Sequence, residues 1–286
     1  TNVGVYPITA AMGTLASSNY NFSFTNGILN IEKAMLNVNA DNKWKSYGAM
    51  NPALTATISG FMNNETLSNS GVTGLPGLST TAVVASSLGV YPIMVNIGSL
   101  ASGNYNFNFI NGDLTIGKAT LTITAQDKIR TYGAANPEFT VAYSGFVNGE
   151  TLATSGLSGK PDFITGAVAT SPVGNYVITP IAGTLTAANY NFVYVNGSLA
   201  IEKALVTVEA DNKNKVYGVV NPTLTASYIG LMNGESFATS GINGAPSLTT
   251  VATASSVVGS YDINASNGSL TSGNYKFQFS KGVLTI

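Results

Sequence analysis

A repeat of 85 residues constrains this chain more than any other feature of its sequence. The motif Asn-Tyr-x-Phe occurs four times, and its tyrosines stand at positions 20, 105, 190 and 275, which are 85 residues apart. Self-similarity at a fixed period indicates a tandem array of one structural unit. We therefore expect residues 1–33 to be the C-terminal part of a truncated repeat, followed by complete repeats at residues 34–118, 119–203 and 204–286.

Alternating apolar residues predict β-strands in each unit. In Tyr20–Phe24 the aromatic residues alternate with polar ones, which is the period of a half-buried strand. Leu29 and Ile31 alternate in the same way after Asn26-Gly27, a pair that suits a type I′ turn. The sequence predicts a β-hairpin here, and the same hairpin with turns at Asn111-Gly112, Asn196-Gly197 and Lys281-Gly282.

One segment of the unit has a helix-like pattern. In Gly60–Leu67, Asn63 is a residue type that caps a helical turn, and Glu65 would lie near the positive end of that turn. A plain loop fits this segment equally well. Because strands and helices do not alternate along the unit, we expect a mostly-β fold. Each domain of about 85 residues would be a β-sandwich or β-grasp-like sheet of six to eight strands, with at most one short helix.

The joints between units contain no flexible linker. Glu32-Lys33-Ala34, Gly117-Lys118-Ala119 and Glu202-Lys203-Ala204 connect the last strand of one unit to the first strand of the next. None of the three joints contains proline or a run of glycine and serine. We therefore expect the domains to be joined stiffly and to form an elongated rod.

Composition excludes several classes of function. The chain has no cysteine and no histidine, which excludes disulfides, thiolate or imidazole metal sites and catalysis by these side chains. A net charge of -1 argues against nucleic acid as a partner, and no apolar run reaches the length of a membrane span. We expect no enzymatic activity, no cofactor and no metal. No signal peptide is visible, so in a secreted protein this would be a mature or excised segment.

Three glutamates stand at one repeat position, namely Glu65, Glu150 and Glu235. A recurrent carboxylate of this kind binds calcium or a partner, or it accepts local hydrogen bonds beside the asparagine two residues before it. Calcium takes several carboxylate or carbonyl ligands. The isolated acid therefore favours the local, structural interpretation.

Lysine recurs at the joints as Lys33, Lys118 and Lys203. These lysines are either solvated or joined to a nearby asparagine or glutamate by an intramolecular isopeptide crosslink. The repeated tyrosines Tyr47, Tyr132 and Tyr217 are interpreted as core residues.

Trp44 is the single tryptophan, and its counterparts in the other repeats are Ile129 and Asn214. Lys43 and Lys45 flank it, so we expect an exposed ring. An exposed tryptophan can stack on a sugar, or it can be an ordinary surface aromatic residue.

The motifs together resemble a known family. In the second unit they read Tyr-Gly-x-x-Asn-Pro at 132–137, Ser-Gly-Phe-x-Asn-Gly-Glu-Thr-Leu at 144–152, Val-Gly-x-Tyr at 173–176, and Asn-Tyr-x-Phe-x-x-x-Asn-Gly-x-Leu-x-Ile at 189–201. This set resembles the MBG domain of the YGX type, found in tandem in large bacterial surface and secreted proteins. Ile229-Gly230-Leu231 and Lys281-Gly282 depart from the pattern. The resemblance implies an extracellular adhesive or stalk role and supplies no catalytic residues.

Two functions follow from these observations. The first is a structural stalk or filament segment of a bacterial extracellular adhesin or surface protein, which projects or links binding regions. Its partners would be neighbouring repeats and other copies in a filament. The alternative is a repeated glycan- or mucin-binding module in cell adhesion, with Trp44 as the candidate contact and a glycan or a host or matrix surface as the partner.

Overall fold

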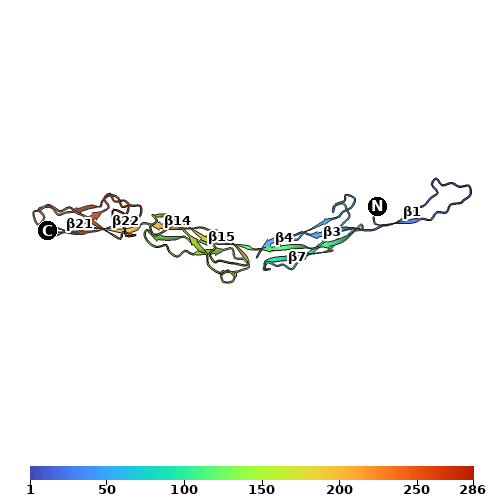
Figure 1. Ribbon diagram of the computed structural model, residues 1–286, viewed down its shortest axis with the longest axis horizontal. Coiled ribbons are helices and arrows are strands. Elements are labelled where there is room, and N and C mark those ends of the chain that lie inside the picture. The colour runs from blue at the N-terminus through green and yellow to red at the C-terminus, as the bar shows by residue number, and fades with distance from the viewer. The chain divides into compact units, whose positions relative to one another are not determined.

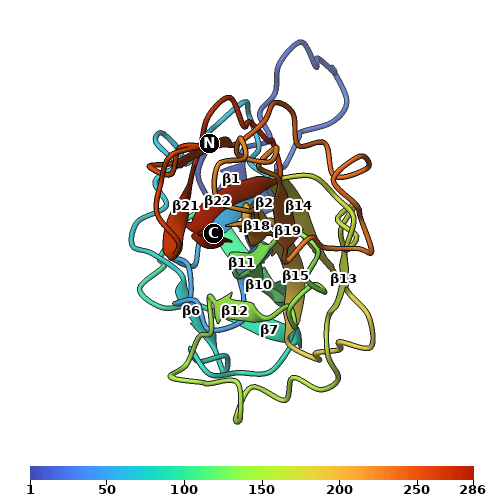
Figure 2. The ribbon, with the colours of Figure 1, turned by 90° about the vertical axis from the view of Figure 1, so that its left-hand side faces the viewer.

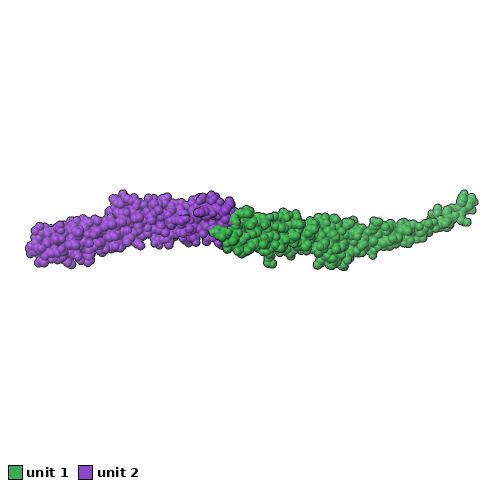
Figure 3. All heavy atoms as spheres, turned by 90° about the horizontal axis from the view of Figure 1, so that it is seen from below, with its two compact units in different colours: residues 1–120, 146–156, 187–191 green, residues 121–145, 157–186, 192–286 purple.

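The protein is composed of strands and loops. The computed structural model describes residues 1–286, and it contains no helix (Figure 1). No segment therefore forms a helix of the length and apolar character needed to cross a membrane. The chain divides into two compact units, one of residues 1–120, 146–156 and 187–191 and the other of residues 121–145, 157–186 and 192–286 (Figure 3).

Each complete repeat contains the same strands in the same order. In the first repeat they are β3 (Ala34–Ala40), β4 (Lys43–Ser46), β5 (Ala56–Ser59), β6 (Gly77–Thr80), β7 (Gly89–Asn96), β8 (Tyr105–Ile110) and β9 (Gly112–Gly117). In the second they are β10 (Ala119–Ala125), β11 (Lys128–Thr131), β12 (Val141–Ser144), β13 (Asp162–Ile164), β14 (Gly174–Ile181), β15 (Tyr190–Val195) and β16 (Gly197–Glu202). In the third they are β17 (Ala204–Ala210), β18 (Lys213–Asn214), β19 (Ala226–Ile229), β20 (Ser247–Thr250), β21 (Ser260–Ser266), β22 (Tyr275–Ser280) and β23 (Gly282–Thr285).

The strands of a repeat form a β-sandwich of two sheets. The three-stranded sheets have the orders β5-β3-β8, β12-β10-β15 and β19-β17-β22, and the four-stranded sheets have the orders β4-β9-β7-β6, β11-β16-β14-β13 and β18-β23-β21-β20. In Figure 2 the red arrows β21 and β22 belong to these two different sheets of the third repeat. The fold predicted from the strand pattern is thereby confirmed as a β-sandwich.

The core lies between the two sheets. Leu36 and Val38 of β3, Ile93 of β7, and Leu114 and Ile116 of β9 are almost completely buried. Each strand alternates these side chains with exposed or half-buried ones. The alternation places one face of each sheet on the core and the other face in solvent.

The strands on either side of Asn111-Gly112 do not form the predicted hairpin. β8 pairs in parallel with β3, while β9 pairs in parallel with β4 and antiparallel with β7. Neither residue of the pair has a positive φ, and the chain passes here from one sheet to the other. Glycine is required because a Cβ at Gly112 would lie 2.4 Å from the carbonyl oxygen of Ala40. The hairpin prediction was wrong because alternation identifies a strand but not its partner.

Of the two alternatives for Gly60–Leu67, the helical turn is wrong and the loop is confirmed, since the segment around Glu65 forms a β-turn. The Glu65 N–H donates to the carbonyl oxygen of Met62 at 2.9 Å, and Asn63 and Asn64 have φ values of 55° and 57°. Two central residues with positive φ define a type I′ turn, which Asn-Gly sequences favour. The other repeats form the same turn at Asn148-Gly149 and Asn233-Gly234, with φ values of 54° and 71° in both. Asn-Gly pairs therefore do form type I′ turns in this chain, at 148–149 and 233–234. The prediction placed these turns at other Asn-Gly pairs, such as Asn111-Gly112, and was wrong there.

Residues 1–33 form a partial unit. β1 (Gly4–Ile8) pairs antiparallel with β2 (Gly27–Ile31), and residues 9–26 contain no strand. Tyr20 is 77% exposed, whereas the equivalent Tyr105 is 3% exposed. The difference follows from topology, because β8 takes β3 as its partner and residues 1–33 have no strand equivalent to β3 ahead of Tyr20.

Candidate functional site

A glutamate bridges two tyrosines where the first and second repeats meet. The hydroxyl of Tyr47, which directly follows β4, donates to Glu150 Oε1 at 2.5 Å. The hydroxyl of Tyr190, the first residue of β15, donates to Glu150 Oε2. Glu150 Oε1 is therefore bonded to the first repeat, and Glu150 Oε2 is bonded to the second. Hydrogen bonds to an ionised carboxylate are stronger than those between neutral groups.

The second and third repeats meet in the same way. Glu235 Oε1 accepts a hydrogen bond from the Tyr132 hydroxyl, and Glu235 Oε2 accepts one from the Tyr275 hydroxyl, both at 2.5 Å. The rings of Tyr132 and Tyr275 meet edge to face, with centroids 5.4 Å apart and planes at 86°. We call this arrangement of two tyrosines and one glutamate the tyrosine–glutamate joint.

The type I′ turn fixes the glutamate in each joint. The Val147 N–H, at the start of the turn, donates to the Tyr190 hydroxyl at 3.1 Å, and the Met232 N–H donates to the Tyr275 hydroxyl at 2.9 Å. Each of these tyrosine hydroxyls thus accepts from the turn backbone and donates to the turn glutamate. The left-handed backbone at the turn therefore determines where the carboxylate lies.

A glycine allows the turn to approach the preceding repeat. A Cβ at Gly48 would lie 2.4 Å from Val147 Cβ, and a Cβ at Gly133 would lie 2.4 Å from Met232 Cβ. The equivalent Gly218 has no atom within 4 Å of its Cβ position. All three glycines have φ between 75° and 85°. Glycine therefore meets two requirements at a joint, the positive φ and the close approach of the next repeat.

A cation braces the loop that carries each joint tyrosine. Lys45 is buried, and its Nζ donates to the carbonyl oxygens of Ala49 and Val83 at 3.1 and 2.7 Å. At the same repeat position, Arg130 Nη2 donates to the carbonyl oxygen of Val168 at 2.6 Å. Burial lowers the pKa of Lys45, because the charged amine loses contact with water. The hydrogen bonds to the two carbonyl oxygens partly offset this cost of desolvation. The sequence signal was a basic residue two positions before each Tyr-Gly pair, and sequence reasoning missed it.

The joint tyrosines are held in their neutral, donating form. The hydrogen bond to Glu150 raises the pKa of Tyr47, and the bond to Glu235 raises the pKa of Tyr132. Burial, followed by the bond to the glutamate, raises the pKa of Tyr190 and of Tyr275 to about 12. Each hydroxyl therefore remains a donor well above neutral pH.

The three joint lysines each contact a main-chain carbonyl. Lys33 Nζ donates to Ser102 O at 2.8 Å, Lys118 Nζ to Ala187 O at 3.1 Å, and Lys203 Nζ to Ser272 O at 2.7 Å. Each lysine is thus bonded to a loop of the repeat that follows it. The isopeptide crosslink stays one of two alternatives for these lysines, and it requires a side-chain amide or carboxyl beside the amine.

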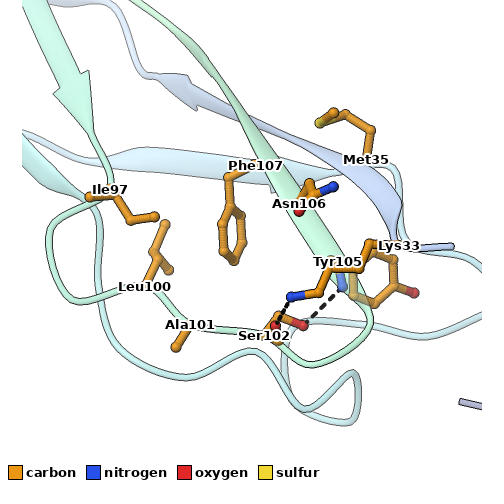
Figure 4. A pocket seen from close by; sticks show the side chains of 9 residues that line it. All are labelled: Lys33, Met35, Ile97, Leu100, Ala101, Ser102, Tyr105, Asn106 and Phe107. Carbon is orange, nitrogen blue, oxygen red and sulfur yellow. Dashed lines mark hydrogen bonds between the residues drawn. The ribbon is translucent and has the colours of Figure 1, made fainter. Parts of the chain in front are cut away.

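An open groove of about 540 Å³ lies beside the first of these lysines. Figure 4 shows Ile97 and Leu100 from one loop facing Phe107 of β8, with Lys33 and Tyr105 at one end. Its lining is about equally polar and apolar. No group of three histidines, cysteines or acids gathers anywhere in the chain to hold a metal.

Trp44 lies on β4 and is 62% exposed, which agrees with the expectation of an exposed ring. The ring covers Gly117 of β9, because a Cβ there would lie 3.0 Å from Trp44 Cζ2. Ile129 at the equivalent position is similarly exposed. Stacking of Trp44 on a sugar stays a prediction.

Comparison with known proteins finds one family. The family model described as MBG domain (YGX type) matches residues 36–115, 121–200 and 206–285. No curated protein matches the chain.

Two solved multi-domain structures are similar at a low level. Drosophila N-cadherin EC1-4 is 8% identical, with 97% of this chain and 81% of that chain covered and a TM-score of 0.27. Sidekick-1 immunoglobulin domains 1-4 are 10% identical, with 99% of this chain and 94% of that chain covered and a TM-score of 0.24. Scores this low carry no argument about function.

Proposed function

Because the chain belongs to the MBG domain family of the YGX type, we propose that it is a stiff stalk or filament segment of a bacterial extracellular adhesin or surface protein. Three tandem copies of this domain fit a repeat module of an extracellular type. In this role the segment projects or links binding regions and performs no catalysis.

The tyrosine–glutamate joint is the observation that carries the proposal. Both oxygens of Glu150 are committed to hydroxyls from two different repeats, and Glu235 repeats the arrangement. Bending at such a joint would break a charge-assisted hydrogen bond and separate two packed rings. A joint that resists bending is what a stalk requires.

The chain between repeats is also too short to act as a hinge. β9 ends at Gly117 and β10 begins at Ala119, and β16 and β17 are likewise separated by the single residue Lys203. The lysine itself is bonded to the next repeat. Covalent and non-covalent connections therefore act together at each joint.

The hydrogen bonds of Glu150 and Glu235 also support a structural role over a catalytic one. The recurrent acid is the residue best placed to serve a repeated active or binding site. In both joints its two oxygens are occupied by tyrosine hydroxyls. We therefore propose that neighbouring repeats are the partners of this side chain.

The alternative function, glycan or mucin binding, rests on the exposed Trp44. Ile129 and Asn214 take its place in the other repeats, so a sugar-stacking site would not be repeated. A glycan array tests this alternative with the wild-type chain and Trp44→Ala. Binding that depends on Trp44 would support the glycan module, and a silent array would favour the stalk.

Small-angle X-ray scattering tests the stalk. A compact unit of about 85 residues has a radius of gyration of about 12 Å, and three such units in a line give roughly 28 Å or more. A single globule of the same length would give roughly 19 Å. The proposal predicts the larger value, and a value near the globular one would contradict it.

A further inference from the structure

The first two strands and the last two strands of a complete repeat run side by side in the same direction. In the first repeat, residues 34–39 of β3 lie opposite residues 105–110 of β8. Residues 43–46 of β4 then lie opposite residues 114–117 of β9. Both pairings are parallel, and the register does not change between the two sheets. We call residues 34–46 and 105–117 the terminal segments of the repeat, and the hydrogen bonds between them the terminal ladder.

One side chain bridges the point where both terminal segments pass from one sheet to the other. The strands are interrupted there, because residues 41–42 lie between β3 and β4 and residue 111 lies between β8 and β9. In this gap the Asp113 N–H donates to Asn42 Oδ1 at 2.8 Å. The two residues are 71 positions apart, as are the paired residues of both sheets. Asn42 therefore joins the terminal segments in the register that the strands themselves have.

The other repeats contain the same bridge. The Ser198 N–H donates to Asp127 Oδ1, and the Val283 N–H donates to Asn212 Oδ1, both at 2.7 Å and both across 71 positions. In the third repeat the strands have this register as well, with residues 204–209 opposite residues 275–280. Asparagine and aspartate share a side-chain oxygen that accepts hydrogen bonds. That acceptor is therefore the property that recurs at this repeat position.

Tension along the chain would load the terminal ladder in shear. It enters the first repeat at Ala34 and leaves it at Gly117. Ala34 lies opposite Tyr105 at one end of the ladder, and Gly117 lies opposite Ser46 at the other end. Pulling these two points apart slides one terminal segment lengthwise past the other, so that the hydrogen bonds of the ladder carry the load together. In an antiparallel hairpin pulled at its two ends, the bonds would instead break one after another.

The core also opposes sliding of the terminal segments. Leu36 and Val38 are fully buried, and a slip of one residue would turn such side chains from the core face to the solvent face. Close packing at the change of sheets acts in the same direction. Gly112 lies so near the Ala40 carbonyl oxygen that a Cβ would be 2.4 Å from it, and a slip would bring a larger residue to this point. The ladder therefore has one register that the core permits.

We propose that each complete repeat bears tension along the chain through its terminal ladder, and that Asn42, Asp127 and Asn212 hold the ladder together where it changes sheets. The inference rests on strand pairing inside a repeat and does not require the stalk role. Resistance to tension within a repeat and resistance to bending at a joint are separate properties. Either one can therefore fail in experiment without the other.

The first test changes only the direction of the force. The chain has no cysteine, so handles for optical tweezers can be attached at introduced cysteines. Met35→Cys with Thr115→Cys pulls the terminal segments lengthwise, whereas Met35→Cys with Asn106→Cys pulls apart two residues that lie opposite each other at one end of the ladder. All three side chains are exposed. We expect unfolding of the first repeat to need several-fold more force with the lengthwise pair. Equal forces for the two pairs would overturn the proposal.

The second test removes the bridge and stretches the full chain between its ends. An unfolded repeat of about 85 residues spans roughly 280–310 Å and the folded ladder roughly 45 Å, so each repeat should unfold in a step of roughly 235–265 Å. The variant carries Asn42→Ala, Asp127→Ala and Asn212→Ala. It should unfold about fivefold faster at constant force, because each ladder has lost one hydrogen bond that breaks in the transition state. Asp127→Asn alone keeps the acceptor and should unfold like the unchanged chain.

A matched control removes an equivalent hydrogen bond outside the ladder in each repeat. Ser99 Oγ, Thr184 Oγ1 and Ser269 Oγ each accept from a main-chain N–H at 3.0 Å. Alanine at these three positions should change the unfolding rate under force by less than about twofold, since these bonds are intact when the ladder breaks. Faster unfolding of the bridge variant alone supports the proposal. Equal rates for the bridge variant and this control variant overturn it.

Discussion

Alanine substitutions in the Tyr-Gly motif can distinguish the energy of the contact between repeats from the energy of backbone strain. Gly133 and Gly218 occupy the same motif, with φ values of 80° and 85°. Alanine in this left-handed region costs about 1 kcal/mol at either position. At Gly218 the new Cβ would meet no atom within 4 Å, whereas at Gly133 it would lie 2.4 Å from Met232 Cβ.

The difference in stability between the two variants measures the cost of disturbing the contact between the second and third repeats. Met232 Cγ and Cε, at 2.8 and 2.9 Å from the added Cβ, belong to a flexible side chain and can move. Met232 Cβ is fixed to the backbone, so the turn of the third repeat must shift. Overpacking of this kind costs about 1–3 kcal/mol. We therefore expect Gly133→Ala to destabilise the protein by about 2–4 kcal/mol and Gly218→Ala by about 1 kcal/mol.

Thermal unfolding followed by circular dichroism or calorimetry measures this difference. Each kcal/mol lowers the melting temperature of a domain of this size by roughly 4–8 °C. Gly48→Ala should behave like Gly133→Ala, because its Cβ would meet Val147 Cβ at the same 2.4 Å. Equal losses for Gly133→Ala and Gly218→Ala would refute the reasoning, since the contact with the next repeat would then contribute nothing.

Three further predictions follow from the joints. Tyr132→Phe should cost about 2 kcal/mol in urea unfolding, because it removes a hydrogen bond to a charged carboxylate, whereas Tyr217→Phe should stay within about 0.5 kcal/mol. Equal effects of these two changes would show that the joint bond is not stabilising. Tyr190 and Tyr275 have folded pKa values of about 12, above the ordinary tyrosine value of about 10, so their contribution to stability is complete below about pH 10 and is lost as the pH rises towards about 12. Urea unfolding across this range, with tyrosinate absorbance recorded, should show that fall, and a flat profile would contradict it. Intact mass spectrometry should give the mass of the sequence, because Lys33, Lys118 and Lys203 each contact a main-chain carbonyl, and a loss of ammonia or water would instead reveal crosslinks.

The strands could be predicted from the sequence, but their pairing could not. Tyr105, Phe107 and Phe109 alternate as expected for a half-buried strand, and β8 forms at Tyr105–Ile110. Alternation reflects which face is buried and carries no information about the neighbouring strand. The partner of β8 is β3, some 70 residues earlier in the chain. The hairpin of β8 with β9 was predicted because the two strands are adjacent in sequence, but adjacent strands need not pair.

The joint shows the same limit. The recurrence of Glu150 and its counterparts was visible, and so was the Tyr-Gly motif, yet nothing local connects Tyr47 with a glutamate 103 residues further on. The interpretation of the repeated tyrosines as core residues was correct for Tyr47 and Tyr132, which are buried at the joints. Tyr217 carries the same motif but is 59% exposed. The next repeat, rather than the domain's own core, is therefore what buries this side chain.

Stiffness at a joint is the central claim, and a distance distribution across one joint tests it most directly. The chain has no cysteine, so Ile164→Cys and Thr249→Cys would place spin labels at equivalent, exposed positions of β13 and β20 in the second and third repeats. Pulsed electron spin resonance should then give one narrow distance peak, and Glu235→Ala should broaden it because both tyrosine bonds of that joint are lost. A broad distribution in the chain with Glu235 intact, or one that Glu235→Ala leaves unchanged, would contradict the account.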